Sequence, residues 1–188
     1  HSYPTRRSSD LGYCFGLSND ERRGTTSEWA PAFNIARRGG LAAMPHGGEL
    51  LAPAHLREVV AHLKPTRIGH GVRAAEDPDL LERIVDAGIA LEVCPASNVS
   101  LGVYPDEHSG PLQQIFESGA QIALSADDPL LFLSRLTDQY RIARDLGASD
   151  RQLAEMALSS IDASLASEHS KSKWRAEVRD WLAADEDE

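Results

Sequence analysis

The chain has 188 residues, with 19 Lys and Arg against 29 Asp and Glu, so its formal net charge is −10. Hydrophobic residues make up 41% and charged residues 26%, a balance typical of a soluble globular protein. No apolar run approaches the roughly 18–20 residues of a membrane helix, and the acidity argues against binding to a nucleic-acid backbone. Two cysteines, Cys14 and Cys94, are too few for a disulfide framework and favour a reducing, cytoplasmic compartment.

The two ends of the chain differ from its middle. Residues 1–11 read HSYPTRRSSDL, with neither an apolar period nor the pattern of a secretory signal. We expect this segment to be a disordered tail or sequence foreign to the fold. Residues 185–188 are all acidic, and we expect them to form a solvated tail. The domain is therefore expected over residues 12–184.

Between these ends, short apolar runs alternate with helical patterns. Proline opens three of the predicted helices, at residues 53, 78 and 111, because its missing N–H is not needed in the first helical turn. Further helices are predicted through Trp29 and Phe33, after Ser149 as N-cap, and through Trp174 and Trp181. The predicted strands cover residues 13–17, 41–45, 67–69, 89–93 and 122–124.

Continuously apolar strands separated by helices indicate an α/β fold with a parallel sheet that is buried on both faces. The pattern gives about five βα units, whereas a (β/α)₈ barrel typically needs roughly 250 residues. We therefore expect a partial (β/α)₈ TIM barrel; a complete five-stranded doubly wound sheet is the alternative. No glycine-rich phosphate-binding motif occurs in the sequence.

Polar residues follow the predicted strands at the points where the strands end: His46, His70, Asn98 and the pair Asp127-Asp128. Each has a structural explanation when taken alone. The histidines suit ordinary loops, and Asp128-Pro129 suits the start of a helix. Together they occupy the edge of a parallel barrel where active sites are built.

These residue types suit metal-assisted hydrolysis. An imidazole and a carboxylate can hold Zn²⁺, and a second histidine can orient or deprotonate a water molecule. Glu49, close to His46 in the sequence, can pass a proton to a substrate. We interpret Cys94 as a buried apolar residue. The remaining histidines are expected at the surface: His55, His62, His108 and His169.

Four ordered motifs resemble the adenosine deaminase family of the amidohydrolase superfamily. They are H-G-G-E from His46, R-I-G-H-G from Arg67, L-E-V-C-P-A-S-N from Leu91 and L-S-A-D-D-P from Leu124. The resemblance runs from about residue 16 to residue 181. It implies a zinc-dependent (β/α)₈ hydrolase that replaces the 6-amino group of an adenine-type base with oxygen and releases ammonia. The implied partner is a small purine nucleoside or base, with no nucleic acid and no membrane.

The resemblance also implies a role for each matching residue. His46 and Asp127 would be zinc ligands. Glu49 would protonate the purine ring, and His70 would position and activate the attacking water. Asp128 would hydrogen-bond the purine on its other ring.

Two features depart from the family pattern. The family begins with a His-x-His pair on its first strand, and no His-x-His occurs here. Asn19 replaces a glycine that usually precedes an Asp-Glu pair and contacts the substrate. We therefore expect the C-terminal part of a deaminase, without the first strands and inactive as it stands. Adenosine is the leading substrate; adenine, aminodeoxyfutalosine, another amide-like or cyclic bond, and a non-catalytic truncated chain are the alternatives.

Overall fold

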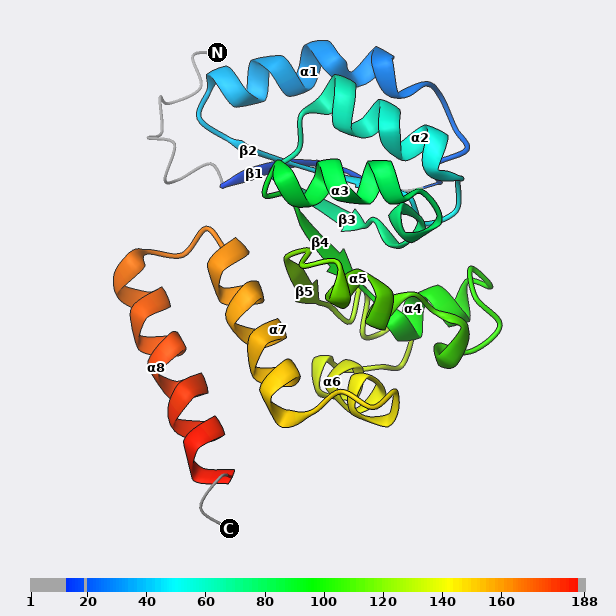
Figure 1. Ribbon diagram of the computed structural model, residues 1–188. Helices are drawn as coiled ribbons and strands as arrows, with labels where there is room; N and C mark the ends of the chain where they lie inside the picture. The colour runs from blue at the N-terminus through cyan, green and yellow to red at the C-terminus, as the bar shows by residue number, and fades with distance from the viewer. Residues whose placement is uncertain (1–12, 19, 186–188) are drawn as a thin grey trace.

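The computed structural model describes residues 13–18 and 20–185, and its centre is a five-stranded parallel sheet flanked by helices (Figure 1). The five predicted strands are confirmed, with ends that differ from the prediction by at most two residues. Residues 1–11 and Asn19, on which two of the sequence predictions fall, lie outside the described part. The strands are β1 (Cys14–Leu17), β2 (Ala42–Gly47), β3 (Arg67–His70), β4 (Ala90–Val93) and β5 (Ile122–Leu124).

The strand order across the sheet is β1-β2-β3-β4-β5, the same as the order along the chain. A doubly wound sheet reverses its direction at a switch point, and its strand order is then not sequential. Continuous sequential winding is instead the arrangement of a (β/α)₈ barrel. The doubly wound alternative is therefore excluded for the described sheet.

Helices follow the strands and cover the sheet from outside. Helices α1, α2 and α3 lie along the half of the sheet that contains β1 to β3, while α7 packs against β5 and α8 packs against α7 (Figure 1). The helices are α1 (Thr26–Arg38), α2 (Pro53–Glu58), α3 (Pro78–Asp86), α4 (Pro95–Ser100), α5 (Leu112–Glu117), α6 (Leu136–Asp145), α7 (Asp150–Ala163) and α8 (Glu168–Asp185). A π-helical turn (Val59–Leu63) extends α2, and 3₁₀ turns cover Val72–Glu76 and Glu107–Ser109.

Two predicted boundaries need correction. Asp128-Pro129 does not start a helix: the chain forms a turn that contains Phe132, and α6 begins only at Leu136. The reason is local, since Asp128 Oδ1 accepts the backbone N–H groups of Leu130 and Leu131 and closes a turn instead. At the C-terminus, α8 reaches Asp185, the first residue of the expected acidic tail.

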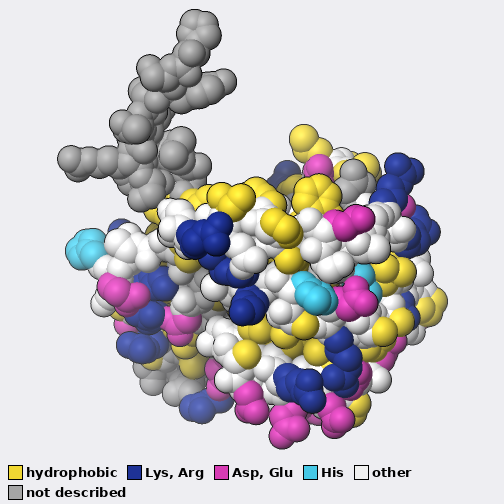
Figure 2. All heavy atoms as spheres, turned by 90° about the horizontal axis from the view of Figure 1, so that it is seen from above, with side chains coloured by type: hydrophobic (Ala, Val, Ile, Leu, Met, Phe, Trp, Pro, Cys, Tyr) yellow, Lys and Arg dark blue, Asp and Glu magenta, His cyan; other side chains and the backbone are white. Residues whose placement is uncertain are grey.

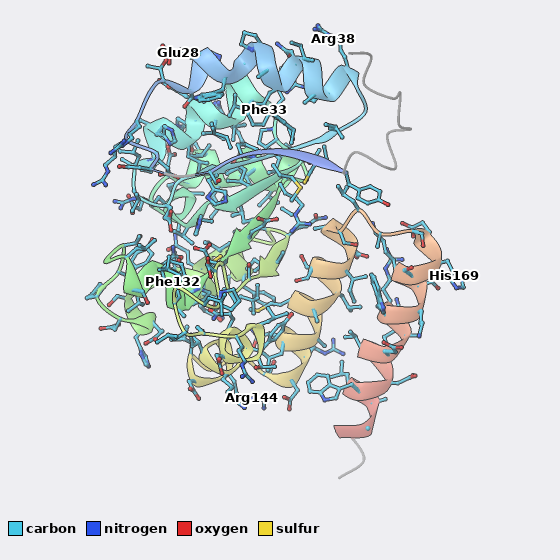
Figure 3. The ribbon with its side chains drawn as sticks, turned by 180° about the vertical axis from the view of Figure 1, so that it is seen from behind. Glu28, Phe33, Arg38, Phe132, Arg144 and His169 are labelled. Carbon is cyan, nitrogen blue, oxygen red and sulfur yellow. The ribbon has the colours of Figure 1, made fainter. Side chains whose placement is uncertain are left out.

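The core lies between the sheet and its outer helices. Phe33 is fully buried and points from α1 towards the sheet, where its ring meets that of Phe15 edge-on at 4.9 Å (Figure 3). Other fully buried side chains come from α2, β3, α3, β4, α5 and β5, so the core is continuous along the sheet. This packing fixes the carboxyl ends of the strands relative to one another. The fully buried residues that extend the core along the sheet are Leu56, Ile68, Ile84, Leu91, Ile115 and Ile122.

The outer surface carries side chains of both charges, with apolar side chains between them on the face above α1 (Figure 2). Within residues 13–18 and 20–185, no helix combines the length and the apolar character needed to cross a membrane.

Candidate functional site

The carboxyl ends of β2, β3 and β5 bring the predicted site residues to one edge of the sheet. His46 lies near the end of β2, in register with Gly69, and His70 is the last residue of β3. Asp127 follows β5. The rings of His46 and His70 meet edge-on, with centroids 5.0 Å apart and planes at 78°. His70 Nε2 in turn lies 3.8 Å from Asp127 Oδ2, so His70 stands beside both predicted metal ligands.

Two of these residues have unusual backbone conformations. The φ angle is 65° at His70 and 56° at Asp127, which places both in the left-handed region. Residues other than glycine adopt that region at a cost of roughly 1–3 kcal/mol, and such strain collects at functional sites. The fold therefore holds these two side chains at the edge of the sheet against a local conformational preference.

His70 is buried and makes its contacts through both ring nitrogens. Its Nδ1 lies 3.3 Å from Glu49 Oε1 and 3.3 Å from Asn98 Nδ2. Burial, together with the neighbouring His46, lowers the pKa of His70 to about 4, although Asp127 acts in the opposite direction. His70 is therefore a neutral imidazole near pH 7.

Glu49 is a buried carboxyl group with an unsatisfied oxygen. Its Oε1 has no hydrogen-bond partner among the described residues. Burial raises its pKa to about 7, and the negative charges of Glu21 and Asp127 add to the increase. Near neutral pH a large fraction of Glu49 is therefore protonated, and a protonated carboxyl group can donate a proton.

Glu21 holds the segment that carries Glu49. Its carboxylate accepts the backbone N–H groups of Glu49, Leu50 and Leu51 at 3.0–3.3 Å. One side chain thus satisfies three backbone N–H groups. The result is a second carboxylate beside Glu49 that fixes its backbone and also raises its pKa.

Asp127 is oriented by a serine from a neighbouring helix. The Oγ of Ser97, in α4, donates to Asp127 Oδ2 at 2.7 Å, and Ser97 is buried. The backbone N–H of Asp127 donates to Ser125 Oγ at 3.2 Å. These two hydrogen bonds fix both the main chain and the side chain of the residue.

Asp128 adjoins Asp127 in the chain, but its side-chain hydrogen bonds lie within its own turn. It is exposed, and its Oδ1 accepts the two N–H groups of the turn described above. Asn19, the other predicted substrate contact, lies outside the described residues.

A cavity of about 320 Å³ opens beside His46. Trp29 and Val59 form part of its wall, and the lining also includes Leu17, Ser18, Asp20, Glu21 and residues 23–26. His55 also lines it, and its Nδ1 is buried with no hydrogen-bond partner in the described part of the chain. His55 is thus half-buried rather than fully exposed, whereas His62, His108 and His169 are exposed as expected.

Sequence reasoning missed two residues that shape the site, Ser97 and Glu21. Ser97 lies in the motif that follows β4 beside Asn98, which was expected at this edge, and their side chains reach Asp127 and His70. The proline at the start of α4 was the available signal, because it predicts a helix that would turn these side chains inward. Glu21 belongs to the Asp-Glu pair that follows β1.

The donor set at this edge suits a zinc ion in part. An imidazole nitrogen and a carboxylate oxygen, from His46 and Asp127, are ligands that Zn²⁺ accepts. Catalytic zinc sites generally use three protein ligands, and the proposed pair supplies two. The pair is thus compatible with zinc as part of a larger set of ligands.

Comparisons with known proteins give a consistent result. The family model described as adenosine deaminase matches residues 7–181. The chain is 56% identical over 171 residues to a protein from Streptomyces coelicolor named putative adenosine/adenine deaminase. The aligned region covers 90% of this chain and 50% of that relative. The chain spans about half the length of the curated relatives it matches.

Solved structures agree on the fold. The crystal structure of adenine deaminase from Arthrobacter aurescens superposes with a TM-score of 0.86 at 30% identity, covering 90% of this chain and 52% of that one. An amidohydrolase from Burkholderia ambifaria, crystallised with bound Zn, gives a TM-score of 0.79 at 24% identity and covers 90% of this chain and 50% of that one. The five-stranded sheet with its helices is therefore part of a (β/α)₈ barrel.

Proposed function

The chain belongs to the adenosine deaminase family, and we propose that its site takes part in the hydrolytic deamination of an adenine-type purine. In this reaction water adds to C6 of the purine, the C6–N bond breaks and ammonia leaves. The leading substrate is adenosine, which would give inosine. The whole enzyme requires more of the barrel than the five βα units described here.

The proposed roles follow the positions of the side chains. His46 and Asp127 would hold a zinc ion, which lowers the pKa of water and so makes hydroxide available near neutral pH. Glu49 donates a proton to the purine ring nitrogen. His70 orients the attacking water and accepts its proton. Ser97 keeps the Asp127 carboxylate in place, and Asp128 is the proposed hydrogen-bond partner of the second purine ring.

The observation that carries this proposal is the pairing of Glu49 with His70. The two groups lie 3.3 Å apart, and their surroundings shift their pKa values in opposite directions, to about 7 and about 4. A carboxyl group that is protonated near pH 7 beside a neutral imidazole supplies an acid and a base at the same point. Deamination needs both, since the ring nitrogen gains a proton while water loses one.

The cavity beside His46 bears on which purine is used. Its volume of about 320 Å³ leaves room for a group beyond the base, and its wall mixes an indole ring with carboxylates and hydroxyl groups. These features favour a nucleoside such as adenosine or aminodeoxyfutalosine. Free adenine is the second candidate, because the similar solved structure from Arthrobacter aurescens is an adenine deaminase.

We also propose that the 188-residue chain is inactive by itself, because His46 and Asp127 are fewer ligands than a catalytic zinc site uses. The non-catalytic alternative is that the chain serves as an interaction partner only. The two free cysteines support a reducing compartment such as the cytoplasm.

A complementation assay tests these proposals. The chain is mixed with the part of the Streptomyces coelicolor relative that it does not match, and ammonia release is measured with adenosine, adenine and aminodeoxyfutalosine. We expect no turnover by the chain alone and turnover by the mixture, fastest with adenosine. A variant with Glu49→Gln in this chain is the control and should abolish turnover. Turnover by the chain alone, or equal rates for the Glu49→Gln mixture, would contradict the proposal.

A further inference from the structure

We propose that Gln139, in α6, is a positioning residue that sets the orientation of α4 and, through it, the places of Asp127 and His70 in the site. Gln139 lies outside every motif that the sequence analysis singled out. The inference rests on the proposed function, because Asp127 and His70 matter there as a metal ligand and as the residue that orients water.

Helix α4 carries the two side chains that hold the site from this side. Ser97 Oγ donates to Asp127 Oδ2 at 2.7 Å, and Asn98 Nδ2 lies 3.3 Å from His70 Nδ1. Ser97 and Asn98 are consecutive residues, so their side chains leave the helix roughly 100° apart. A rotation or a shift of α4 therefore moves both contacts together.

Helix α4 depends on its surroundings for its own stability. It has six residues, and helices of that length are unstable in water when isolated. Its N-cap residue is Cys94, whose side chain makes no capping hydrogen bond. The backbone N–H groups of its first turn have no partners within the helix, so they need partners from elsewhere in the fold.

Gln139 supplies one of these partners. Its Oε1 accepts the backbone N–H of Ala96, 43 positions away in the chain, at 3.1 Å. Its Nε2 donates to Ser134 Oγ at 2.7 Å and to the carbonyl oxygen of Arg135 at 3.3 Å. The side chain is fully buried, where an amide is costly unless it is hydrogen-bonded. One end of the amide thus holds α4 and the other holds the start of α6.

The link from Gln139 to the site is short. Ala96 directly precedes Ser97 and Asn98, so a fixed N–H at Ala96 fixes the turn from which both side chains project. Without the Gln139 oxygen that N–H loses its acceptor, and α4 can move relative to β3 and β5. A misplacement of about 1 Å caused far from the chemistry can lower a rate roughly 100-fold.

Two substitutions separate positioning from stability. Gln139→Met has a similar size and makes none of the three hydrogen bonds, whereas Gln139→Glu keeps an oxygen that can accept from Ala96. Both lose the donor to the Arg135 carbonyl, so both should lower the midpoint of urea unfolding. Gln113→Met, at the exposed surface of α5, is the control.

The complementation assay gives the kinetic result. We expect Gln139→Met to lower kcat at least about tenfold while KM changes less than about twofold, because α4 positions reacting groups. Gln139→Glu should keep kcat within about threefold of wild type in spite of its lower stability. Gln113→Met should match wild type in both constants.

Hydrogen exchange in the free chain gives a result that does not depend on turnover. By NMR, the backbone N–H of Ala96 and the side-chain amide of Asn98 should exchange slowly in wild type and Gln113→Met, and faster in Gln139→Met. If Gln139→Met does not fold, the wild type decides. An N–H in the first turn of a helix is protected only when a group outside the helix accepts it.

Three results would overturn the inference: fast exchange at Ala96 in wild type, a wild-type kcat in Gln139→Met, or equal losses of kcat in Gln139→Met and Gln139→Glu. Absence of turnover in the wild-type mixture would contradict the proposed reaction instead, and the exchange rates at Ala96 and Asn98 would then decide the positioning role.

Discussion

The imidazole of His46 lies directly against the α-carbon of Gly69 on the neighbouring strand. A methyl group on that α-carbon would stand 2.3 Å from His46 Cδ2 and 2.8 Å from its Nε2. The two residues are register partners in the pairing of β2 with β3. The absence of a side chain at Gly69 is therefore what allows the ring of His46 to lie across β3 and meet His70.

Gly69→Ala should displace the His46 ring. We expect a loss of about 1–3 kcal/mol in the free energy of unfolding, the usual cost of overpacking, and at least tenfold lower activity in the complementation assay. Urea unfolding and ammonia release measure the two effects. Gly39→Ala, at the exposed end of α1, is the control and should change neither strongly. Unchanged activity in Gly69→Ala would show that the position of His46 is unimportant.

Ser97→Ala should loosen Asp127. The substitution removes the 2.7 Å hydrogen bond to Oδ2, and hydrogen bonds to charged groups contribute about 1.5–3 kcal/mol. We expect a destabilisation in that range and weaker zinc binding, measured by urea unfolding and competition with a chelator. Ser100→Ala, in the same helix but exposed, should leave zinc affinity unchanged. Equal zinc affinities for wild type and Ser97→Ala would contradict the positioning role.

Glu49→Gln should change how stability depends on pH in the metal-free chain. The pKa of Glu49 rises from an ordinary 4.5 to about 7 on folding, so the folded state prefers the protonated form. As pH increases from about 4.5 to 7, the unfolded chain releases this proton first and the wild type loses stability. A glutamine has no such proton.

The difference in unfolding free energy between Glu49→Gln and wild type should therefore grow by about 1–3 kcal/mol across this range, in favour of the variant. Urea unfolding at a series of pH values measures it. If the plots of unfolding free energy against pH for wild type and Glu49→Gln stay parallel from pH 4.5 to 8, Glu49 has the same pKa in the folded and unfolded chain, which would contradict the prediction.

Phe33→Ala should destabilise the contact between α1 and the sheet. Phe33 is fully buried and its ring meets Phe15, and truncation of a buried phenylalanine typically costs about 3–5 kcal/mol. Ile35→Ala is the control from the same helix, since Ile35 is 64% exposed and its loss should cost less than about 0.5 kcal/mol. Urea unfolding of both variants measures the effect. Similar unfolding midpoints for Phe33→Ala and Ile35→Ala would show that α1 is not packed as described.

The strands and the edge of the site could be predicted from sequence because both follow from local patterns. Apolar runs gave the strands, and the ends of parallel strands share an edge, so His46, His70 and Asp127 were expected together. The contact of Ser97 with Asp127 depends on how α4 packs, and the contact of Glu21 with the backbone at Glu49 joins residues 28 positions apart. Such contacts are set by tertiary packing and leave no periodic signal.

The errors have the same origin. Asp128-Pro129 has the local features of a helix start, but the Asp128 side chain satisfies two N–H groups in a turn. His55 looks like a surface residue on an amphipathic helix, but it is half-buried and lines a cavity together with Trp29, Leu17, Ser18 and residues that precede α1.

The left-handed backbone at His70 and Asp127 changes how a saturation mutagenesis scan of this protein should be interpreted. β-Branched and bulky replacements at these two positions would fail for conformational reasons, whatever their chemistry, and would inflate the apparent importance of the native side chains. Asparagine tolerates this conformation well, so His70→Asn and Asp127→Asn isolate the chemical contribution. Variant-effect scores at both sites are best normalised to those two substitutions.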